Sequence, residues 1–589
     1  MLTDKKMFGR LFKYMKRYYL NYILAILLVG LIVLFDILSP YVISLSLEEI
    51  GKDEINIIRL ICIFICGITL AVTANILQFI QTMLLNKTGN KIVYQIRADV
   101  FSHIQTLSHH QFNNIPVGTL VTRATSDINV LFQLYTNILV NIIRYVATIV
   151  GVLIAMFILN AKLALIVLCI FPIILTLTIV FRYFLRKIHR NVRNEVSSMN
   201  AFLSENISGI KVTQIFNQEE KKYCEFKTAN NRLKKATLKE IFTFGIFRPL
   251  VYLIYISTVI IVLYTGSNEA INASFGAITV AITYNELYTF YQYISKFFNP
   301  IQSLADQYNQ LQSAFAAAEK IFTVLDIESE IKDEEGATDI DLIGNIEFKN
   351  VWFSYIEGEW ILKDVSFKIN AKDVVAFVGA TGAGKTTILG LITRNYDIQS
   401  GQILIDGRDI KTIKISSLRS QIGQMLQDVF LFSGTIADNI RLNNEAITDE
   451  AIIDACKEVN AMHFINKQPE GIYAKVSERG NNLSLGERQL ISFARTLVHK
   501  PKLMILDEAT SNIDTETEKL IQDSLEKVIK NNTMIMVAHR LSTIQHATKI
   551  FVFDHGRIIE EGSHQELLKK RGKYYQLYKL QYQKNPFDN

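Results

Sequence analysis

The 589-residue chain has few cysteines and little net charge, and both shortages exclude classes of protein. Its five cysteines are scattered along the sequence. Because unpaired cysteines mostly behave as small hydrophobic residues, the sequence indicates neither a disulfide framework nor a metal cluster. A net charge of +6 is small for this length, so we expect no nucleic-acid partner. No internal repeat is visible, so the chain resembles half of a symmetric assembly.

The chain is rich in apolar sequence, which is distributed unevenly. Apolar residues make up 49% of the chain and charged residues 20%. Long apolar runs stop near residue 300, and charge is denser beyond that point. A chain of this length has room for more than one domain. The pattern therefore predicts a membrane half followed by a soluble half.

Six apolar stretches are long enough to cross a bilayer, which takes about 20 residues. The first stretch is too long for the core of a cleavable signal peptide, so we expect it to stay as a membrane span. Lys and Arg are concentrated in residues 1–17 and 185–240, whereas the first loop, 47–56, is acidic. The positive-inside rule then predicts that both termini lie in the cytoplasm. The expected spans are 20–46, 57–85, 131–159, 161–184, 241–264 and 273–300.

The segments after the second and fourth spans are long and keep helical periodicity. We therefore expect the spanning helices to continue into the cytoplasm and to turn near 114–128 and 203–215. Solvated helical hairpins without a partner are the alternative. The expected domains are an all-α transmembrane domain over 1–313, a linker over 314–345 and an α/β domain over 346–589.

The soluble half contains a glycine-rich loop between an apolar strand and a helical pattern. Residues 379–386 read GATGAGKT and follow the apolar run 374–378. This is the phosphate-binding loop G-x-x-x-x-G-K-[ST], whose backbone N–H groups close around phosphate oxygens. Lys385 is expected to reach the β- and γ-phosphates, and the Thr386 hydroxyl to bind Mg²⁺. The predicted phosphate-binding set is Gly379, Thr381, Gly382, Ala383, Gly384, Lys385, Thr386 and Thr387.

A second apolar strand, Leu503 to Leu506, ends in two carboxylates, Asp507 and Glu508. Asp507 is suited to hold Mg²⁺ through water. Glu508 lies where a general base could orient or polarise the attacking water. The alternative is a solvated strand end, which the apolar strand and the upstream phosphate-binding loop both disfavour.

The sequence LSLGE at 483–487 resembles the LSGGQ signature of ATP-binding-cassette (ABC) proteins. With the preceding membrane half, the chain resembles ABC exporters of the multidrug and lipid-flippase type over nearly all its length. The resemblance implies a Q-loop role for Gln427, at Mg²⁺ and water, and a γ-phosphate contact for His539. It also implies that Tyr355 stacks on adenine, with core packing as the alternative, and that Asp514 belongs to the loop that crosses to the partner subunit.

The resemblance further implies a dimer, because each ATP then lies between the phosphate-binding loop of one subunit and the signature of the other. Ser484 and Gly486, which approach the opposing γ-phosphate in the family, are present. Glu487 replaces the usual Gln and adds a negative charge near a polyanionic ligand. Glu508 and His539 are retained, and this combination resembles one subunit of the family's heterodimers, which implies a partner that lacks the base. A homodimer that tolerates LSLGE is the alternative.

Ionisable residues in the expected spans are candidate substrate contacts, because burying such groups in lipid is costly. These are Asp36 in the first span, Arg144 in the third and Glu286 in the sixth. Glu286 lies among tyrosines and a phenylalanine that suit bulky apolar or cationic compounds. Internal ion pairing or hydrogen bonding between helices is an equally open alternative.

The predicted function is ATP-driven export of hydrophobic or amphipathic compounds, drugs or lipids, by alternating access. A dedicated lipid flippase and an ATP-gated channel or regulator on the same scaffold are the alternatives. The predicted cofactors are ATP and Mg²⁺, and the predicted partners are a second subunit, the bilayer and a hydrophobic small molecule. The many Ile, Lys and Asn residues favour a bacterial plasma membrane.

Overall fold

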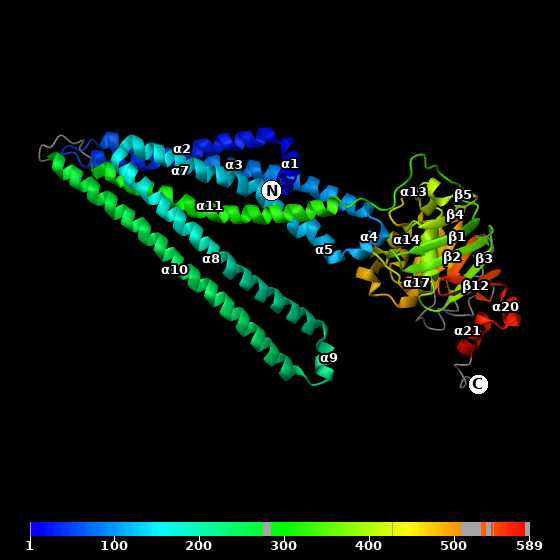
Figure 1. Ribbon diagram of the computed structural model, residues 1–589. Coiled ribbons are helices and arrows are strands. Elements are labelled where there is room, and N and C mark those ends of the chain that lie inside the picture. Colours follow the sequence, from blue (N-terminus) through cyan, green and yellow to red (C-terminus); the bar gives the residue numbers. More distant parts are fainter. Residues whose placement is uncertain are drawn as a thin grey trace. The chain divides into compact units, whose positions relative to one another are not determined.

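The computed structural model describes residues 2–274, 284–426, 428–507, 532–537, 544–545 and 547–582 (Figure 1). The chain forms two compact units. The first comprises residues 1–104 and 118–326, and the second comprises residues 105–117 and 327–589.

The first unit consists mainly of long helices in its described residues. Helices α8 and α10 pack along each other and are connected through the short helix α9, as Figure 1 shows. Helix α7 packs against α2, α8 and α11. The elements are α1 (Leu2–Lys16), α2 (Tyr19–Ile50), α3 (Ile57–Thr106), α5 (Val117–Thr122), α6 (Ile128–Gln133), α7 (Leu139–Leu159), α8 (Ala161–Ser208), α9 (Ile210–Ile215), α10 (Glu219–Ser274) and α11 (Tyr284–Leu325), with π-helical segments η1 (Arg123–Asp127) and η2 (Leu134–Ile138).

Five helical runs within the described residues are long and apolar enough to cross a membrane. Helices α3, α8 and α10 contain 50, 48 and 56 residues. At about 1.5 Å per residue each exceeds the roughly 30 Å of a bilayer core, so each extends well beyond it. Part of the sixth expected span, 275–283, lies outside the described residues, and α11 begins directly after it. The five runs are Tyr19–Ile50, Ile57–Thr106, Val117–Leu159, Ala161–Ser208 and Glu219–Asn268.

Buried tyrosines connect the helices at the N-terminal end of the first unit. The Tyr22 hydroxyl donates to the Tyr135 carbonyl oxygen at 2.9 Å, and the Tyr135 hydroxyl donates to the Leu11 carbonyl oxygen at 3.2 Å. The Asn21 side-chain amide donates to the Thr88 hydroxyl at 2.9 Å. These bonds satisfy polar groups inside an apolar cluster, and they fix α1 and α2 against η2 and α3.

The second unit is built around a six-stranded sheet in the order β12-β11-β3-β10-β9-β6. Its strands are parallel except for the edge pair β11 and β12, which is antiparallel. A separate four-stranded antiparallel sheet has the order β2-β1-β4-β5. The strands are β1 (Ile346–Ser354), β2 (Trp360–Ile369), β3 (Val374–Gly379), β4 (Ser400–Ile405), β5 (Arg408–Asp409), β6 (Ile422–Met425), β7 (Gly434–Thr435), β8 (Lys475–Val476), β9 (Leu503–Asp507), β10 (Thr533–Val537), β11 (Lys549–Asp554) and β12 (Arg557–Gly562).

The strand sequences are almost continuously apolar because the parallel sheet is buried on both faces. Alternate residues of β3 enter different core clusters: Val374, Ala376 and Val378 pack on one face, and Val375 and Phe377 on the other. The helices of this unit are α4 (His109–Asn114), α12 (Lys385–Ile392), α13 (Ile415–Arg419), α14 (Ile436–Arg441), α15 (Asp449–Glu458), α16 (Met462–Ile465), α17 (Leu485–Val498), α20 (His564–Lys570) and α21 (Lys573–Tyr582), with 3₁₀ turns η3 (Ile410–Thr412), η4 (Gly471–Tyr473) and η5 (Glu478–Gly480).

Candidate nucleotide-binding site

The phosphate-binding loop connects β3 to α12, and its backbone requires glycine. Gly382 and Gly384 have φ angles of +81° and +101°, in the left-handed region that side chains disfavour. A Cβ atom on Gly384 would lie 2.7 Å from Leu362 Cδ2, and one on Gly379 would lie 2.4 Å from the Phe553 carbonyl oxygen. The glycines therefore allow both the turn and the close approach of neighbouring chain segments.

Lys385 is the first residue of α12, and its ammonium group turns back over the loop. Its Nζ atom donates to the carbonyl oxygens of Gly379 and Ala380 at 2.8 and 3.0 Å. The side chain is 5% exposed. The positive charge therefore lies beside the N-terminus of α12, where backbone N–H groups and the helix dipole also favour an anion. Of the other predicted loop residues, Ala383 and Thr387 are buried and Thr381 and Thr386 are exposed.

The other predicted nucleotide residues follow neighbouring parallel strands. Strand β10 lies between β3 and β9, and Val537 pairs with both Phe377 and Asp507. Because parallel strands present their carboxyl ends at one edge, the phosphate-binding loop and Asp507 lie at the same edge of the sheet. Strand β6, beside β9, ends at Met425 at this edge. Gln427, Glu508, Asp514 and His539 lie outside the described residues.

Two oxygen donors at this edge fit a magnesium ion. Asp507 is 7% exposed at the end of β9, and Thr386 presents a hydroxyl in the first turn of α12. Carboxylate and hydroxyl oxygens, completed by water and phosphate, are the ligands that Mg²⁺ prefers. The donor set therefore suits Mg²⁺ bound together with a nucleotide.

Tyr355 follows β1 and is 39% exposed. Its hydroxyl is 3.0 Å from the Thr387 hydroxyl, directly after the phosphate-binding loop. Its ring packs edge-on against Phe353 and Tyr396, with ring centroids 4.9 and 5.1 Å away. The partial exposure differs from that of a core residue and leaves ring surface available for stacking.

Helix α4 contacts the same aromatic group, which the sequence reasoning missed. The rings of His109 and His110 lie 6.1 and 6.4 Å from the Tyr396 ring. His110 Nδ1 is 3.1 Å from a Glu330 carboxylate oxygen, and the Gln111 side chain donates to the Glu328 carbonyl oxygen at 2.7 Å. A single ring, Tyr396, thus separates α4 from Tyr355. In the sequence, only the two adjacent histidines hint at this contact, and they do not indicate which residue they pack against.

The LSLGE segment begins α17, and Glu487 has a local role that the sequence reasoning also missed. Ser484 is the N-cap, and its hydroxyl accepts from the Glu487 N–H at 3.2 Å. A Glu487 carboxylate oxygen accepts from the Ser484 N–H at 2.7 Å. This is a capping box, S-x-x-E, and Gln serves equally well in its last position. Gly486 lies in the first turn of the helix. The carboxylate therefore lies at the N-terminus of α17.

Two of the three ionisable candidates in the spans bind each other. An Arg144 guanidinium nitrogen on α7 is 3.3 Å from an Asp36 carboxylate oxygen on α2. Glu286 lies in the first turn of α11. Of its aromatic neighbours, Phe290 and Tyr293 are buried in the helix core, whereas Tyr291 is 40% exposed. The contact between Asp36 and Arg144 supports the ion-pair alternative for these two residues.

The fold and the site define a P-loop nucleotide-binding domain joined to a helical membrane domain. A family model described as the ABC transporter transmembrane region matches residues 21–301, and one described as ABC transporter matches residues 362–511. The chain belongs to the ABC transporter family, and its enzymatic activity is ATP hydrolysis coupled to transport.

Similar proteins cover nearly the whole chain. A probable multidrug resistance ABC transporter ATP-binding/permease protein of Bacillus subtilis is 37% identical over 91% of this chain and 80% of its own length. An ATP-dependent lipid A-core flippase of Desulfotalea psychrophila is 33% identical over 98% of this chain and 100% of its own. The structure of a bacterial Atm1-family ABC exporter with ATP bound has a TM-score of 0.76 at 25% identity, over 96% of this chain and 98% of that one.

Proposed function

We propose that the chain is one half of a dimeric exporter that uses ATP to move hydrophobic or amphipathic compounds out of a bacterial cytoplasm. The observation that carries this function is the alignment of the phosphate-binding loop and Asp507 at one sheet edge, in a chain that also has membrane-spanning helices. Relatives that are named as multidrug exporters and as a lipid flippase support the substrate class. A dedicated flippase remains the second candidate. In this proposal six spans cross the plasma membrane and both termini are cytoplasmic.

The phosphate end of the nucleotide is held by charge and by backbone donors. Lys385 and the N–H groups of the loop bind the phosphate oxygens of ATP, and Tyr355 stacks on the base. Thr386 and Asp507 hold Mg²⁺, which neutralises phosphate charge when bound. Glu508 acts as the general base that orients the attacking water. Gln427 and His539 complete this half-site, and Asp514 reaches toward the partner.

When the nucleotide-binding domains close on ATP, the cytoplasmic turns transmit this movement to the membrane-spanning helices. Helix α4 is the turn between α3 and α5, and its histidines pack on Tyr396 beside Tyr355. A base stacked on Tyr355 therefore restricts the motion of the neighbouring Tyr396 ring, which α4 contacts. We assign α4, which ends where the turn expected at 114–128 begins, and α9, which lies within the turn expected at 203–215, as the coupling turns that convert ATP binding into outward opening.

The assembly that we favour is a heterodimer. The Glu487 carboxylate already neutralises the N-terminus of α17, so the signature of this chain binds the partner's ATP weakly. Within the membrane half, Glu286 is our candidate for contact with cationic substrates, and Asp36 with Arg144 is assigned to holding α2 against α7.

The test is ATP hydrolysis by the purified full-length chain in liposomes, with and without a co-expressed partner half-transporter from the same organism. Cationic amphipathic drugs and phospholipids are added as stimulants, with Glu508→Gln as the inactive control. We expect weak hydrolysis by the chain alone, and stimulated hydrolysis with the partner. Strong drug-stimulated hydrolysis by the single chain would refute the heterodimer, and hydrolysis that no membrane compound alters would refute the exporter.

A further inference from the structure

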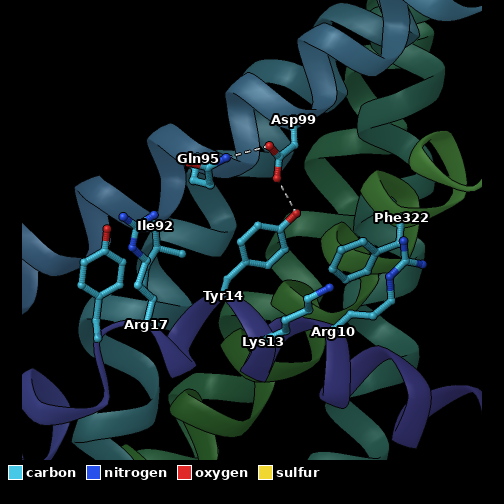
Figure 2. A pocket seen from close by; sticks show the side chains of 9 residues that line it. Arg10, Lys13, Tyr14, Arg17, Ile92, Gln95, Asp99 and Phe322 are labelled. Atoms are coloured by element: carbon cyan, nitrogen blue, oxygen red, sulfur yellow. Dashed lines mark hydrogen bonds between the residues drawn. The ribbon is translucent and has the colours of Figure 1, made fainter.

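A pocket of about 350 Å³ lies where α1 meets α3 and α11 within the first unit. Figure 2 shows Lys13, Tyr14 and Arg10 of α1 lining it from one side, Gln95 and Asp99 of α3 from another, and Phe322 of α11 at its end. The volume lies in the range of small-ligand sites, roughly 300–1,000 Å³. No candidate nucleotide or substrate residue that the structure describes lines this pocket.

The pocket is basic, and two of its cations have no ion pair among the described residues. Lys13 and Arg17 are four residues apart, and both are exposed. Arg10 differs, because its guanidinium binds Asp326 at 2.7 Å and lies 4.3 Å from the centre of the Phe322 ring. The charges of Lys13 and Arg17 are therefore available to a ligand, while Arg10 and Phe322 form a fixed wall.

The pocket's own carboxylate is held by neutral donors. The Tyr14 hydroxyl donates to one Asp99 oxygen at 2.9 Å, and the Gln95 side-chain amide donates to the other at 2.8 Å. Burial and the neighbouring Asp99 raise the pKa of Tyr14 to about 12, so the hydroxyl keeps its proton at neutral pH. Asp99 keeps its negative charge, but the pocket lining has three cations, Arg10, Lys13 and Arg17, against this one carboxylate and so stays basic.

The pocket lies at the end of the membrane spans. The hydrogen bond between Asn21 and Thr88 sets these residues of α2 and α3 at one level. The pocket residues of the N-terminal segment come before Tyr19, where the α2 span begins, and the pocket residues of α3 come after Thr88. Both sets therefore lie on the same side of this level, outside the α2 span. On another face of α1, Phe8 and Phe12 are 50% and 55% exposed. A helix with exposed phenylalanines on one face and cations on another is typical of the membrane interface.

We propose that this pocket binds the headgroup of an anionic phospholipid from the adjoining leaflet. The phosphate lies between Lys13 and Arg17, and the first acyl carbons lie against the apolar lining formed by Phe322 and Ile92. The bound lipid joins α1 to α3 and α11, so it stabilises the packing of these helices. The apolar wall and the interfacial depth favour a lipid over a free anion. The proposal requires that the chain spans a membrane, and it is independent of which compound the chain exports.

The test is native mass spectrometry of the full-length protein in detergent, titrated with phosphatidylglycerol or with phosphatidylcholine. A surface cation contributes about 1 kcal/mol to binding anionic lipid. We therefore expect Lys13→Ala with Arg17→Ala to weaken phosphatidylglycerol binding about 30-fold and to leave phosphatidylcholine unaffected. Asp99→Asn, which removes the negative charge but keeps an acceptor for Tyr14, should strengthen binding. The matched control is Lys16→Ala with Lys91→Ala, which removes two exposed cations of α1 and α3 that do not line the pocket.

Equal loss in the control pair would show general surface attraction and would overturn the pocket assignment. Retention of wild-type binding in Lys13→Ala/Arg17→Ala would overturn it as well, provided that thermal melting shows a folded protein. A last measurement adds millimolar inorganic phosphate to the protein with phosphatidylglycerol bound. We expect the lipid to stay bound. Full displacement of the lipid by phosphate would indicate a site for free anions rather than for lipids.

Discussion

Replacing Glu487 with Gln should strengthen the ATP site to which this chain contributes its signature. The carboxylate accepts from the Ser484 N–H at 2.7 Å and so occupies the N-terminus of α17. A Gln side chain can make the same capping hydrogen bond through its oxygen. The substitution therefore removes a negative charge while preserving the local helix cap.

The magnitude follows from the charge separation. A phosphate bound at this helix N-terminus would lie about one helical turn, roughly 5.4 Å, from the carboxylate. Two unit charges at that distance repel by about 1.5–3 kcal/mol for an effective dielectric constant of about 20–40. The ATP concentration for half-maximal dimer closure should therefore fall by about 10- to 150-fold.

The assay measures ATP-dependent closure of the dimer formed with the co-expressed partner, with this chain in the Glu508→Gln background, which separates ATP binding from hydrolysis. The chain offers a matched control in α20, where Ser563 and Glu566 form the same kind of capping box. Glu566→Gln should leave the half-maximal ATP concentration unchanged. An unchanged or higher value for Glu487→Gln would refute the view that its charge weakens the site.

Three further substitutions test other parts of the structure. Gly384→Ala places a side chain at φ +101° and 2.7 Å from Leu362 Cδ2. The affinity for a fluorescent ATP analogue, measured by equilibrium binding, should therefore fall by at least about tenfold. Normal affinity would contradict the loop geometry. Arg394 is 1% exposed and donates to carbonyl oxygens, including that of Ile413 at 3.1 Å. Arg394→Met leaves these acceptors unpaired and should lower the free energy of unfolding, measured by denaturant titration, by about 2–4 kcal/mol. A change below about 0.5 kcal/mol would contradict this role. Tyr396→Leu removes the ring between α4 and the ATP site, so drug stimulation of ATP hydrolysis should fall while basal hydrolysis persists, and unchanged stimulation would exclude this route of coupling.

Local patterns in the sequence predicted the nucleotide domain well. The apolar run 374–378, the glycines after it and the helical pattern from Lys385 specify strand, loop and helix through contacts a few residues apart. The structure has β3 and α12 at these places. Likewise, the apolar run before Asp507 forms β9. Here the chemistry of each residue type limits the conformation strongly.

Contacts between distant residues were harder to predict. Asp36 and Arg144 are more than 100 residues apart, and only the packing of α2 on α7 brings them together. The contact of His110 with Tyr396 depends in the same way on where α4 lies. The capping box of Glu487 is a different case, because S-x-x-E is a local signal. The likeness to the family signature indicates the charge of Glu487 but not its hydrogen bond to the Ser484 N–H.

The most direct test of ATP-driven export is transport by inside-out membrane vesicles from the native host. The chromosomal copy is replaced by wild-type or Glu508→Gln protein, so that any natural partner subunit is present. The probes are cationic amphipathic dyes and fluorescent phospholipids. Our account predicts ATP-dependent accumulation of at least one probe with the wild-type chain and its loss with Glu508→Gln at equal protein levels. Accumulation that is identical in both vesicle preparations, for every probe, would contradict it.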